Sequence, residues 1–363
     1  MGSDRVYVIA EAGVNHNGDA DLALRLIDAA AEAGADAVKF QTFVPETLVS
    51  RQAPKADYQR RHTAADESQL AMLRRLALDR PTHERLLEHC RTLGIDFLSS
   101  PFDIDSARFL VEDLGLPRLK LGSGELTNGP LLLGCARLGV PLILSTGMST
   151  LDEVDRALSL LAFGIAEAEA EPRGEALREI STEVRHGLLQ DRLTLLHCTT
   201  EYPCPPGDVN LRAMDTLRQA FGLTVGYSDH TPGIHVAVAA AARDAKLIEK
   251  HFTLDRELPG PDHQASLEPN ELRAMIDAIR DIEQALGDGH KRPAASEQGN
   301  SAIARRSLVA SRPIRAGECF GIDNLAAKRP GHGLSPMDYW SLLGQPARRD
   351  YAPDEVIDPC ERP

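Results

Sequence analysis

Short apolar segments alternate with amphipathic segments from Val6 to Leu286, and the alternation repeats eight times. The apolar segments have the length of strands, and the segments between them repeat apolar residues at helical spacing, as in DADLALRLIDAAAEAGA. The predicted strands are Val6–Ala10, Ala37–Phe40, Asp96–Ser99, Arg118–Leu121, Pro141–Leu144, Leu193–His197, Leu223–Tyr227 and Leu247–His251. Nearly continuous apolar strands, each followed by a helix, are typical of a parallel sheet covered by helices. Eight such units favour an α/β fold with a closed (β/α)8 TIM barrel, and an open doubly wound sheet is the alternative.

Two stretches interrupt this alternation, and a third ends it. Residues 44–67 form a long loop after the second strand, on the side of a barrel where active-site lids are expected. Residues 164–189 are rich in Ala and Glu and are predicted to form a charged, solvated helical hairpin. Residues 287–298 have the composition of a linker, and residues 299–363 contain short strands broken by Gly and Pro. We therefore predict a catalytic barrel over residues 1–286, followed by a small β-rich domain.

Composition narrows the function mainly by exclusion. With 42% hydrophobic and 26% charged residues the chain has the composition of a soluble globular protein, and no apolar run is long enough to span a membrane. The formal net charge of −14 argues against nucleic acid as a partner. The N-terminus leads directly into a strand without the hydrophobic region of a signal peptide, so a cytoplasmic location is expected. The six cysteines lack CxxC spacing and are predicted to be reduced thiols.

Two histidines are predicted to lie side by side at the ends of the last two strands. Strand alternation turns His230 to the same side as Ser228, and His251 to the same side as Glu249. The helix between these strands, expected to begin at Pro232, makes them parallel neighbours. Parallel strands lie about 4.8 Å apart, so two imidazoles can bind one cation at bonds of about 2.1 Å and leave positions open for substrate and water. The alternative is that the histidines are satisfied polar residues at loop mouths.

Polar residues also follow the other predicted strands, at the end where barrel enzymes bind their substrates. Lys39 and Lys120 would be costly inside a barrel mouth without an anion, and the glycines of KLGSGE let backbone N–H groups approach a ligand. Hydroxyl donors are added by Ser100, Ser123, Ser145 and Ser228. Together these groups suit a phosphate and a carboxylate. Structural salt bridges from the lysines to Glu11 and Glu125 are the alternative.

Three further residues are placed near this mouth. Glu11 ends the first strand, and its carboxylate is expected to bind the metal, to orient a group or to act as a base. The rigid PGPD turn after the last strand is expected to bring Asp262 over the mouth. Cys198 is predicted from the alternation of its strand to face outward, so a thiol nucleophile is not expected.

The chain resembles the N-acetylneuraminate (sialic acid) synthases in nine motifs, in the order AEAGVNHNG, VKFQTF, SSPFD, KLGSGE, ILSTGMST, LLHCTTEYPCP, GYSDHT, EKHFT and PGPDH. The tail resembles their antifreeze-like (SAF) domain. This resemblance implies that phosphoenolpyruvate is condensed with an open-chain N-acyl hexosamine to give a nine-carbon 2-keto acid and phosphate, with C–O cleavage. It also implies a divalent metal that activates the sugar aldehyde, typically Mn²⁺, with Mg²⁺ or Co²⁺ as alternatives.

The resemblance further implies roles for individual residues. His230 and His251 match the metal ligands, and Glu11, Lys39 and Lys120 match catalytic positions. Positions that match phosphoenolpyruvate contacts are Lys39, Ser100, Lys120, Ser123, Ser145, Thr200 and Ser228. Positions that match sugar contacts are Gln41, Glu125, Tyr202 and Asp262, with Arg329 supplied by the tail domain of a second subunit in a domain-swapped homodimer. The motifs look closer to the sialic and legionaminic branches, so the implied sugar is N-acetylmannosamine or a 2,4-diacetamido-dideoxy hexose.

Two other functions remain open from the residues alone. A metal-dependent sugar aldolase or isomerase would use the same barrel without phosphoenolpyruvate. A non-catalytic sugar-binding protein would use its tail domain for assembly.

Overall fold

The structure is a computed structural model that describes residues 5–56, 60, 67–167, 169–173 and 181–361. The chain divides into two compact units, Met1–Gly287 and Asp288–Pro363. Each unit has its own apolar core and is described by itself. Within the described ranges, no helix combines the length and apolar character needed to cross a membrane.

The first unit is built on the strands β1 (Tyr7–Gly13), β2 (Ala37–Thr42), β3 (Asp96–Pro101), β4 (Leu119–Leu121), β5 (Leu142–Ser145), β6 (Leu193–Cys198), β7 (Thr224–Asp229) and β8 (Leu247–His251). They form one eight-stranded sheet in the order β3-β2-β1-β8-β7-β6-β5-β4, and all paired strands are parallel. The outer strands of this order, β3 and β4, also contact each other and close the sheet. The predicted (β/α)8 TIM barrel is therefore confirmed, and the open sheet is excluded.

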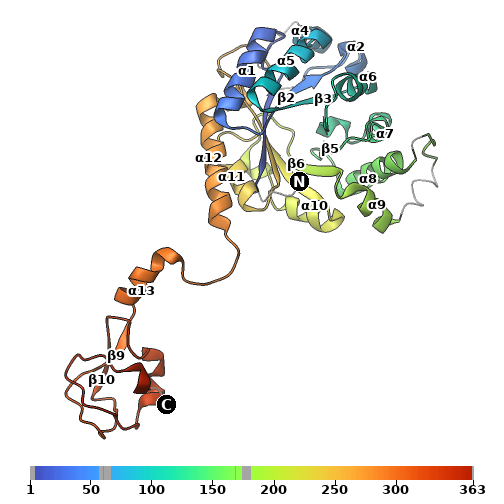
Figure 1. Ribbon diagram of the computed structural model, residues 1–363. Coiled ribbons are helices and arrows are strands. Elements are labelled where there is room, and N and C mark those ends of the chain that lie inside the picture. Colours follow the sequence, from blue (N-terminus) through green and yellow to red (C-terminus); the bar gives the residue numbers. More distant parts are fainter. Residues whose placement is uncertain (1–4, 57–59, 61–66, 168, 174–180, 362–363) are drawn as a thin grey trace. The chain divides into compact units, whose positions relative to one another are not determined.

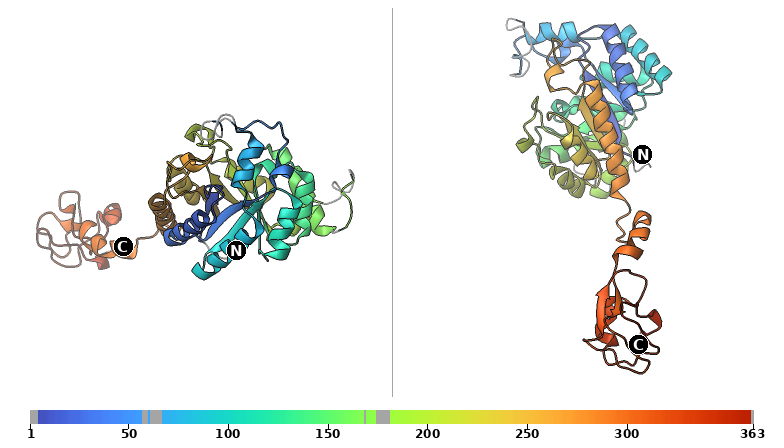
Figure 2. Two further views of the ribbon diagram at one scale, coloured as in Figure 1. Left: turned by 90° about the horizontal axis from the view of Figure 1, so that it is seen from above. Right: turned by 90° about the vertical axis from the view of Figure 1, so that its left-hand side faces the viewer.

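Helices surround the barrel, and most of them cover its outside, as Figures 1 and 2 show. They are α1 (Ala20–Ala33), α2 (Pro45–Leu48), α4 (Gln69–Leu76), α5 (Arg80–Leu93), α6 (Ile104–Arg108), α7 (Gly129–Arg137), α8 (Leu151–Ala166), α9 (Thr182–Leu189), α10 (Ala213–Phe221), α11 (His235–Ala242) and α12 (Pro269–Leu286). The sequence sets their ends. The carboxylate of Asp19 accepts two backbone N–H groups in the first turn of α1, and the helix stops at Gly34, whose φ is 87°.

Alternate residues of the strands fill the barrel interior. The inner apolar layer consists of Ile9, Ala37, Leu98, Ile143, Leu196 and Leu247. Neighbours such as Val8 and Ile248 belong to the larger core between strands and helices. Gly226 also lies on the inner side, where a Cβ atom would be 2.4 Å from the backbone oxygen of Leu247. Toward the carboxyl ends the inward positions are polar, so these side chains point into the mouth of the barrel.

The helix between β7 and β8 starts later than expected. The sequence predicts a start at Pro232, but α11 begins at His235. Gly233 adopts a left-handed conformation with φ 71°, which interrupts any helix begun at the proline. The predicted crossover itself is confirmed, because β7 and β8 pair in parallel.

The two interruptions of the βα pattern are described only in part. Residues 44–67 are not loop throughout, because α2 forms a short helix within them. Of residues 164–189, the first belong to the end of α8 and the last to α9, and these two helices contact each other. The portions of both stretches that fall in the gaps given above lie outside the described residues.

The second unit contains α13 (Gln298–Ala304), β9 (Ser307–Ala310), β10 (Leu325–Lys328) and α14 (Tyr339–Leu342). Its two strands pair antiparallel. Leu308, Phe320 and Tyr351 are among the buried residues of its small core. Part of the predicted linker is helical, because a 3-10 turn at Ala295–Glu297 leads into α13. All six cysteines are free in the structure, and that they are reduced thiols stays a prediction.

Candidate active site

A cavity of about 310 Å³ opens at the carboxyl ends of the barrel strands. All eight strands place at least one side chain in its wall. Among the residues that the sequence predicts for the site, those lining the cavity are Glu11, Lys39, Gln41, Ser100, Lys120, Ser123, Ser145, Thr200, Tyr202, Ser228, His230, His251 and Asp262. Residues that are far apart in the sequence therefore converge on one hollow.

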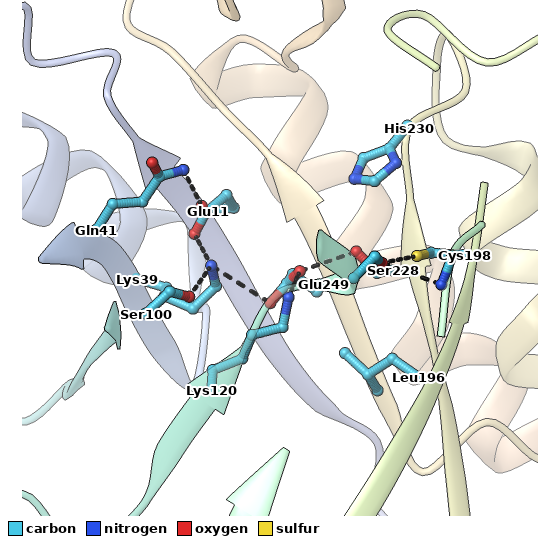
Figure 3. A network of polar contacts seen from close by, with 12 residues as sticks. Glu11, Lys39, Gln41, Ser100, Lys120, Leu196, Cys198, Ser228, His230 and Glu249 are labelled. Carbon is cyan, nitrogen blue, oxygen red and sulfur yellow. Dashed lines mark hydrogen bonds and ion pairs between the residues drawn. The ribbon is translucent and has the colours of Figure 1, made fainter. Parts of the chain in front are cut away.

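A network of ion pairs crosses this cavity (Figure 3). Lys39 Nζ lies 2.6 Å from Glu11 Oε2 and 3.7 Å from Glu249 Oε2. Lys120 Nζ lies 3.0 Å from Glu249 Oε1. The side chains involved are at most 6% exposed, so the two cations are neutralised within the protein. The salt-bridge alternative is thus partly realised, but the second carboxylate is Glu249 and not Glu125.

The two carboxylates of this network differ in their affinity for protons. Burial raises the pKa of Glu11 to about 7, while the charge of Lys39 opposes that rise. Burial also acts to raise the pKa of Glu249, but Lys120 and Lys39 together outweigh it and hold the pKa well below its usual range. Glu249 is therefore a fixed anion, whereas Glu11 can gain or lose a proton near neutral pH.

Hydroxyl groups occupy the wall formed by β5 and β6. The Oγ of Ser145 and the Oγ1 of Thr200 are buried and have no hydrogen-bond partner in the described part of the chain. Ser123 Oγ accepts a hydrogen bond of 3.0 Å from the N–H of Gly147. A Cβ atom at Gly147 would lie 2.4 Å from Thr200 Oγ1, so only glycine permits this close approach. The unpartnered hydroxyls suit a ligand with several acceptor oxygens.

The position of Cys198 shows that one prediction, an outward-facing side chain, is wrong. Its side chain faces the cavity and not outward, and its Sγ lies 3.0 Å from Ser123 Oγ. The prediction failed because Leu196, which shares its face of the strand, is itself part of the inner apolar layer. Burial raises the pKa of the Cys198 thiol, so it stays protonated, in line with the expectation that it is no nucleophile.

His230 and His251 leave adjacent strands and meet with their ring centroids 5.4 Å apart. The Nδ1 of His230 lies 2.7 Å from the carbonyl oxygen of Thr199, which assigns the proton to Nδ1 and leaves a lone pair on Nε2. Burial lowers the pKa of His230 to about 4 and lowers that of His251 well below its ordinary value. Both rings are therefore neutral at pH 7, which is the form that binds a divalent metal.

The surroundings of His251 test whether a cation fits here. Its Nδ1 is buried without a hydrogen-bond partner among the described residues, and Asp262 Oδ2 lies 3.9 Å away. A buried polar atom without a partner costs free energy unless a ligand completes it. In the described ranges no group of three or more His, Cys, Asp or Glu side chains is arranged to hold a metal. The protein would supply two imidazoles and leave the other positions to substrate and water, which fits a catalytic cation.

Comparison with known proteins identifies the family. Residues 26–291 match the NeuB family, and residues 305–359 match the SAF domain. The chain belongs to the NeuB family. It is 48% identical over 353 residues to the N,N'-diacetyllegionaminic acid synthase of Campylobacter jejuni, covering 97% of this chain and 99% of that protein. The synthase of the same name from Legionella pneumophila is 44% identical, covering 93% of this chain and 89% of that protein.

Solved structures agree with this assignment. The N-acetylneuraminic acid synthetase of Leptospira borgpetersenii, crystallised with citrate, is 32% identical to the chain with a TM-score of 0.64. The match covers 82% of this chain and 90% of that one. The resemblance inferred from the nine sequence motifs is therefore confirmed, including the SAF domain.

One residue that the resemblance placed in the NeuB site, Glu125, is not among the residues that line the described cavity. Glu125 lies in the turn after β4 and accepts a hydrogen bond of 2.7 Å from Asn128 Nδ2. Arg329 follows β10 in the second unit, and its role at a partner's site stays a prediction. Glu249, in contrast, joins both lysines but was not predicted from the sequence to belong to the site. Its signal was the strand alternation, which places it on the same face as His251.

Proposed function

We propose that this NeuB-family enzyme condenses phosphoenolpyruvate with an open-chain 2,4-diacetamido hexose, giving a nine-carbon acid of the N,N'-diacetyllegionaminic type and phosphate. Family membership gives the reaction class, a transferase that joins phosphoenolpyruvate to an N-acyl hexosamine. The observation that carries the choice of sugar is the match to two N,N'-diacetyllegionaminic acid synthases over nearly the whole chain. Phosphoenolpyruvate contains no nitrogen, so a sugar must bring both acetamido groups. The aldolase and the non-catalytic sugar-binding protein are not favoured.

Phosphoenolpyruvate is proposed to bind between the two lysines and the hydroxyl wall. Its phosphate and carboxylate would compete with Glu249 for Lys39 and Lys120, and would accept hydrogen bonds from Ser145 and Thr200. This placement is supported by the buried hydroxyls, which have no partner among the described residues. Gln41, Tyr202 and Asp262 are left to orient the sugar, and Ser100, Ser123 and Ser228 complete the lysine side of the site.

In the condensation, C3 of phosphoenolpyruvate forms a bond to the aldehyde carbon of the sugar, and the aldehyde oxygen gains a proton. Water adds to C2 and loses one proton. The new C2 hydroxyl then loses its remaining proton to the departing phosphate as the C2–O bond to phosphate breaks, which leaves the keto group at C2. Glu11 is proposed to accept the proton from the attacking water. Its support is geometric, because the carboxylate is fixed between Lys39 at 2.6 Å and Gln41 Nε2 at 3.5 Å on the cavity wall.

The NeuB family is metal-dependent, and the pair of neutral histidines supports a divalent cation at this end of the cavity. His230 and His251 would hold it. Mn²⁺ is the proposed ion, with Mg²⁺ and Co²⁺ as alternatives, and when bound it would polarise the aldehyde of the sugar. The two imidazoles act only by binding, because both are neutral and buried.

The assembly and location of the enzyme are also part of the proposal. A small SAF domain that buries little core gains by docking on a second copy, where Arg329 of the partner subunit would contact the substrate. We propose a domain-swapped homodimer. A cytoplasmic location is proposed because phosphoenolpyruvate is made there.

Phosphate release tests this function. The purified protein is incubated with Mn²⁺, phosphoenolpyruvate labelled with ¹⁸O at its bridging oxygen, and either a 2,4-diacetamido hexose or N-acetylmannosamine. We expect one phosphate per product, with the label in the phosphate and faster turnover of the diacetamido sugar. Release of unlabelled phosphate would contradict C–O cleavage, and faster turnover of N-acetylmannosamine would contradict the proposed sugar.

A further inference from the structure

A buried ion pair lies directly behind the two histidines, on the opposite face of the same strands. Lys250 Nζ is 2.8 Å from Asp229 Oδ2, and both side chains are 0% exposed. Asp229 is the last residue of β7 and directly precedes His230, and Lys250 precedes His251 on β8. Strand alternation therefore points the charged pair away from the cavity and the histidines into it. None of the steps proposed above uses this pair.

The ion pair stands where the backbone ladder between the two strands ends. The last paired residues of β7 and β8 are Asp229 and Lys250. His230 and His251 come one residue later, beyond the ladder, so backbone pairing does not extend to the residues whose spacing a shared cation requires. The side-chain bridge continues the connection at the point where the ladder stops.

The same two side chains also fix the backbone on both sides of His230. Asp229 Oδ1 accepts hydrogen bonds from the N–H of Thr231 at 2.9 Å and from its hydroxyl at 2.8 Å. Lys250 Nζ donates a second bond to the carbonyl oxygen of Thr231. A residue of β8 thus holds the residues before and after His230, which ties the position of this histidine to β8.

Other contacts tie each histidine to different parts of the barrel. His230 accepts a backbone hydrogen bond from Cys204 and is oriented by Thr199, both of which follow β6. The carbonyl of His251 accepts the N–H of Leu267, and the next residue, Phe252, bonds to the carbonyl of Glu11 on β1. These contacts fix each histidine separately. A link across β7 and β8 is needed to fix the distance between them.

On the cavity side, Ser228 donates to Glu249 Oε1 at 2.8 Å and also joins the two strands. Glu249 is shared with Lys39 and Lys120, the proposed anion site, so its position depends on what those lysines bind. The pair behind the histidines is fully buried and is not part of the cavity wall, so a ligand in the cavity does not compete for it. It is the more constant of the two links.

Stability alone gives a weak reason for such a pair. Two charges removed from water lose hydration that their mutual attraction barely restores, and apolar residues of similar size are often no less stable. We propose that Asp229 and Lys250 are positioning residues that set the spacing of His230 and His251 for a shared divalent cation. The inference rests on the proposed metal site and assigns no chemistry to the pair itself.

The test removes both charges together. In the double variant Asp229→Asn with Lys250→Met, the asparagine still accepts the hydrogen bonds of Thr231, but the bridge to β8 is lost and no charge is left unpaired. We expect a folded protein whose Mn²⁺ dissociation constant, measured by the EPR signal of free Mn²⁺, is about tenfold to a hundredfold higher. Neither substrate nor turnover enters this measurement.

A matched control lies at the other end of the barrel. Asp36 pairs with Arg280 Nη2 at 2.9 Å and also accepts a backbone hydrogen bond of 2.8 Å from Val8. The variant Asp36→Asn with Arg280→Met loses a pair that is 16% and 20% exposed, together with the contact from Arg5 to Asp36, and it keeps the backbone bond. We expect it to lower the unfolding temperature and to leave the Mn²⁺ dissociation constant unchanged.

The outcomes separate this inference from the proposed function. If wild type and the variant His230→Ala with His251→Ala bind Mn²⁺ equally, the metal site itself is wrong and the inference falls with it. If the histidines are needed but the Asp229→Asn, Lys250→Met variant binds like wild type, only the inference is overturned. Should that variant not fold, Lys250→Arg keeps the charge and displaces the donor. For Lys250→Arg we expect an Mn²⁺ dissociation constant that rises by less than the tenfold to hundredfold expected for the double variant, at an unchanged unfolding temperature. An unchanged dissociation constant overturns the proposal.

Discussion

Polar side chains enter the barrel at both of its ends, but they have different partners at each. At the amino end, Tyr7 donates a hydrogen bond to Asp96, and the Arg118 guanidinium lies over the Tyr7 ring at 5.1 Å from its centre. At the carboxyl end, the hydroxyl of Ser145 and the Nδ1 of His251 are buried without any partner in the described residues. Such atoms cost free energy until a ligand pairs with them. Nη1 of Arg118 is such an atom at the amino end, whereas the carboxyl end holds Ser145 Oγ, Thr200 Oγ1 and His251 Nδ1 together on one cavity wall. This concentration of unpartnered atoms marks the end that binds.

The largest effect is expected from Glu11→Gln at the carboxyl end. The amide has the same shape as the carboxylate but cannot accept a proton from water, so kcat for phosphate release should fall by about 10²- to 10⁴-fold. The unfolding temperature should fall as well, because the buried ammonium of Lys39 then keeps only Glu249, at 3.7 Å, as a charged partner. Steady-state phosphate release and thermal unfolding check both parts.

The amino end supplies the control for this substitution. Asp96→Asn makes the same chemical change where the carboxylate faces Tyr7. Its kcat should equal that of wild type. A Glu11→Gln enzyme that keeps more than about a tenth of the wild-type kcat would show that this carboxylate transfers no essential proton.

The sequence was sufficient to predict the barrel and most of its mouth. Strand alternation alone placed Ser228 with His230 and Glu249 with His251, and the structure has them on the cavity wall. It did so because a strand buried on both sides keeps a strict period of two. Position along the strand then separates the apolar inner layer from the polar mouth.

The predictions that failed concern information that alternation does not contain. Alternation defines two faces but not which of them is inside, and Leu196 was misleading because the inside of the barrel is apolar as well. Cys198 was assigned to the wrong face for that reason. Alternation also stops where a strand stops, and the turn after β4 carries Glu125 away from the cavity. The late start of α11 depends on the backbone of Gly233, which no apolar pattern records.

A smaller effect is expected from Ser145→Ala, with opposite signs for binding and stability. If the hydroxyl serves a ligand, its loss should raise KM for phosphoenolpyruvate by about tenfold, the value of one hydrogen bond. In the free enzyme the same hydroxyl is buried and unpaired, so the free energy of unfolding should stay the same or rise by about 1 kcal/mol. Kinetics and chemical denaturation measure the two.

The neighbouring residue gives a matched comparison. The hydroxyl of Thr146 donates a hydrogen bond of 3.0 Å to the carbonyl of Leu196, so Thr146→Val should lower the free energy of unfolding by about 1 kcal/mol. If Ser145→Ala were destabilising to the same extent, its hydroxyl would have a partner within the protein, and the argument for a ligand there would fail.

The smallest effect on catalysis is expected from Tyr7→Phe at the amino end. The substitution keeps the ring under Arg118 but removes the hydrogen bond to Asp96, so the free energy of unfolding should fall by about 1 kcal/mol. Both kcat and KM should match wild type, because the inner apolar layer around Ile9 lies between Tyr7 and the cavity. Denaturation curves and steady-state kinetics on the same preparation make the comparison. A change of kcat without a change in the free energy of unfolding would mean that the two ends of the barrel are coupled. It would contradict the assignment of ligand binding to the carboxyl end alone.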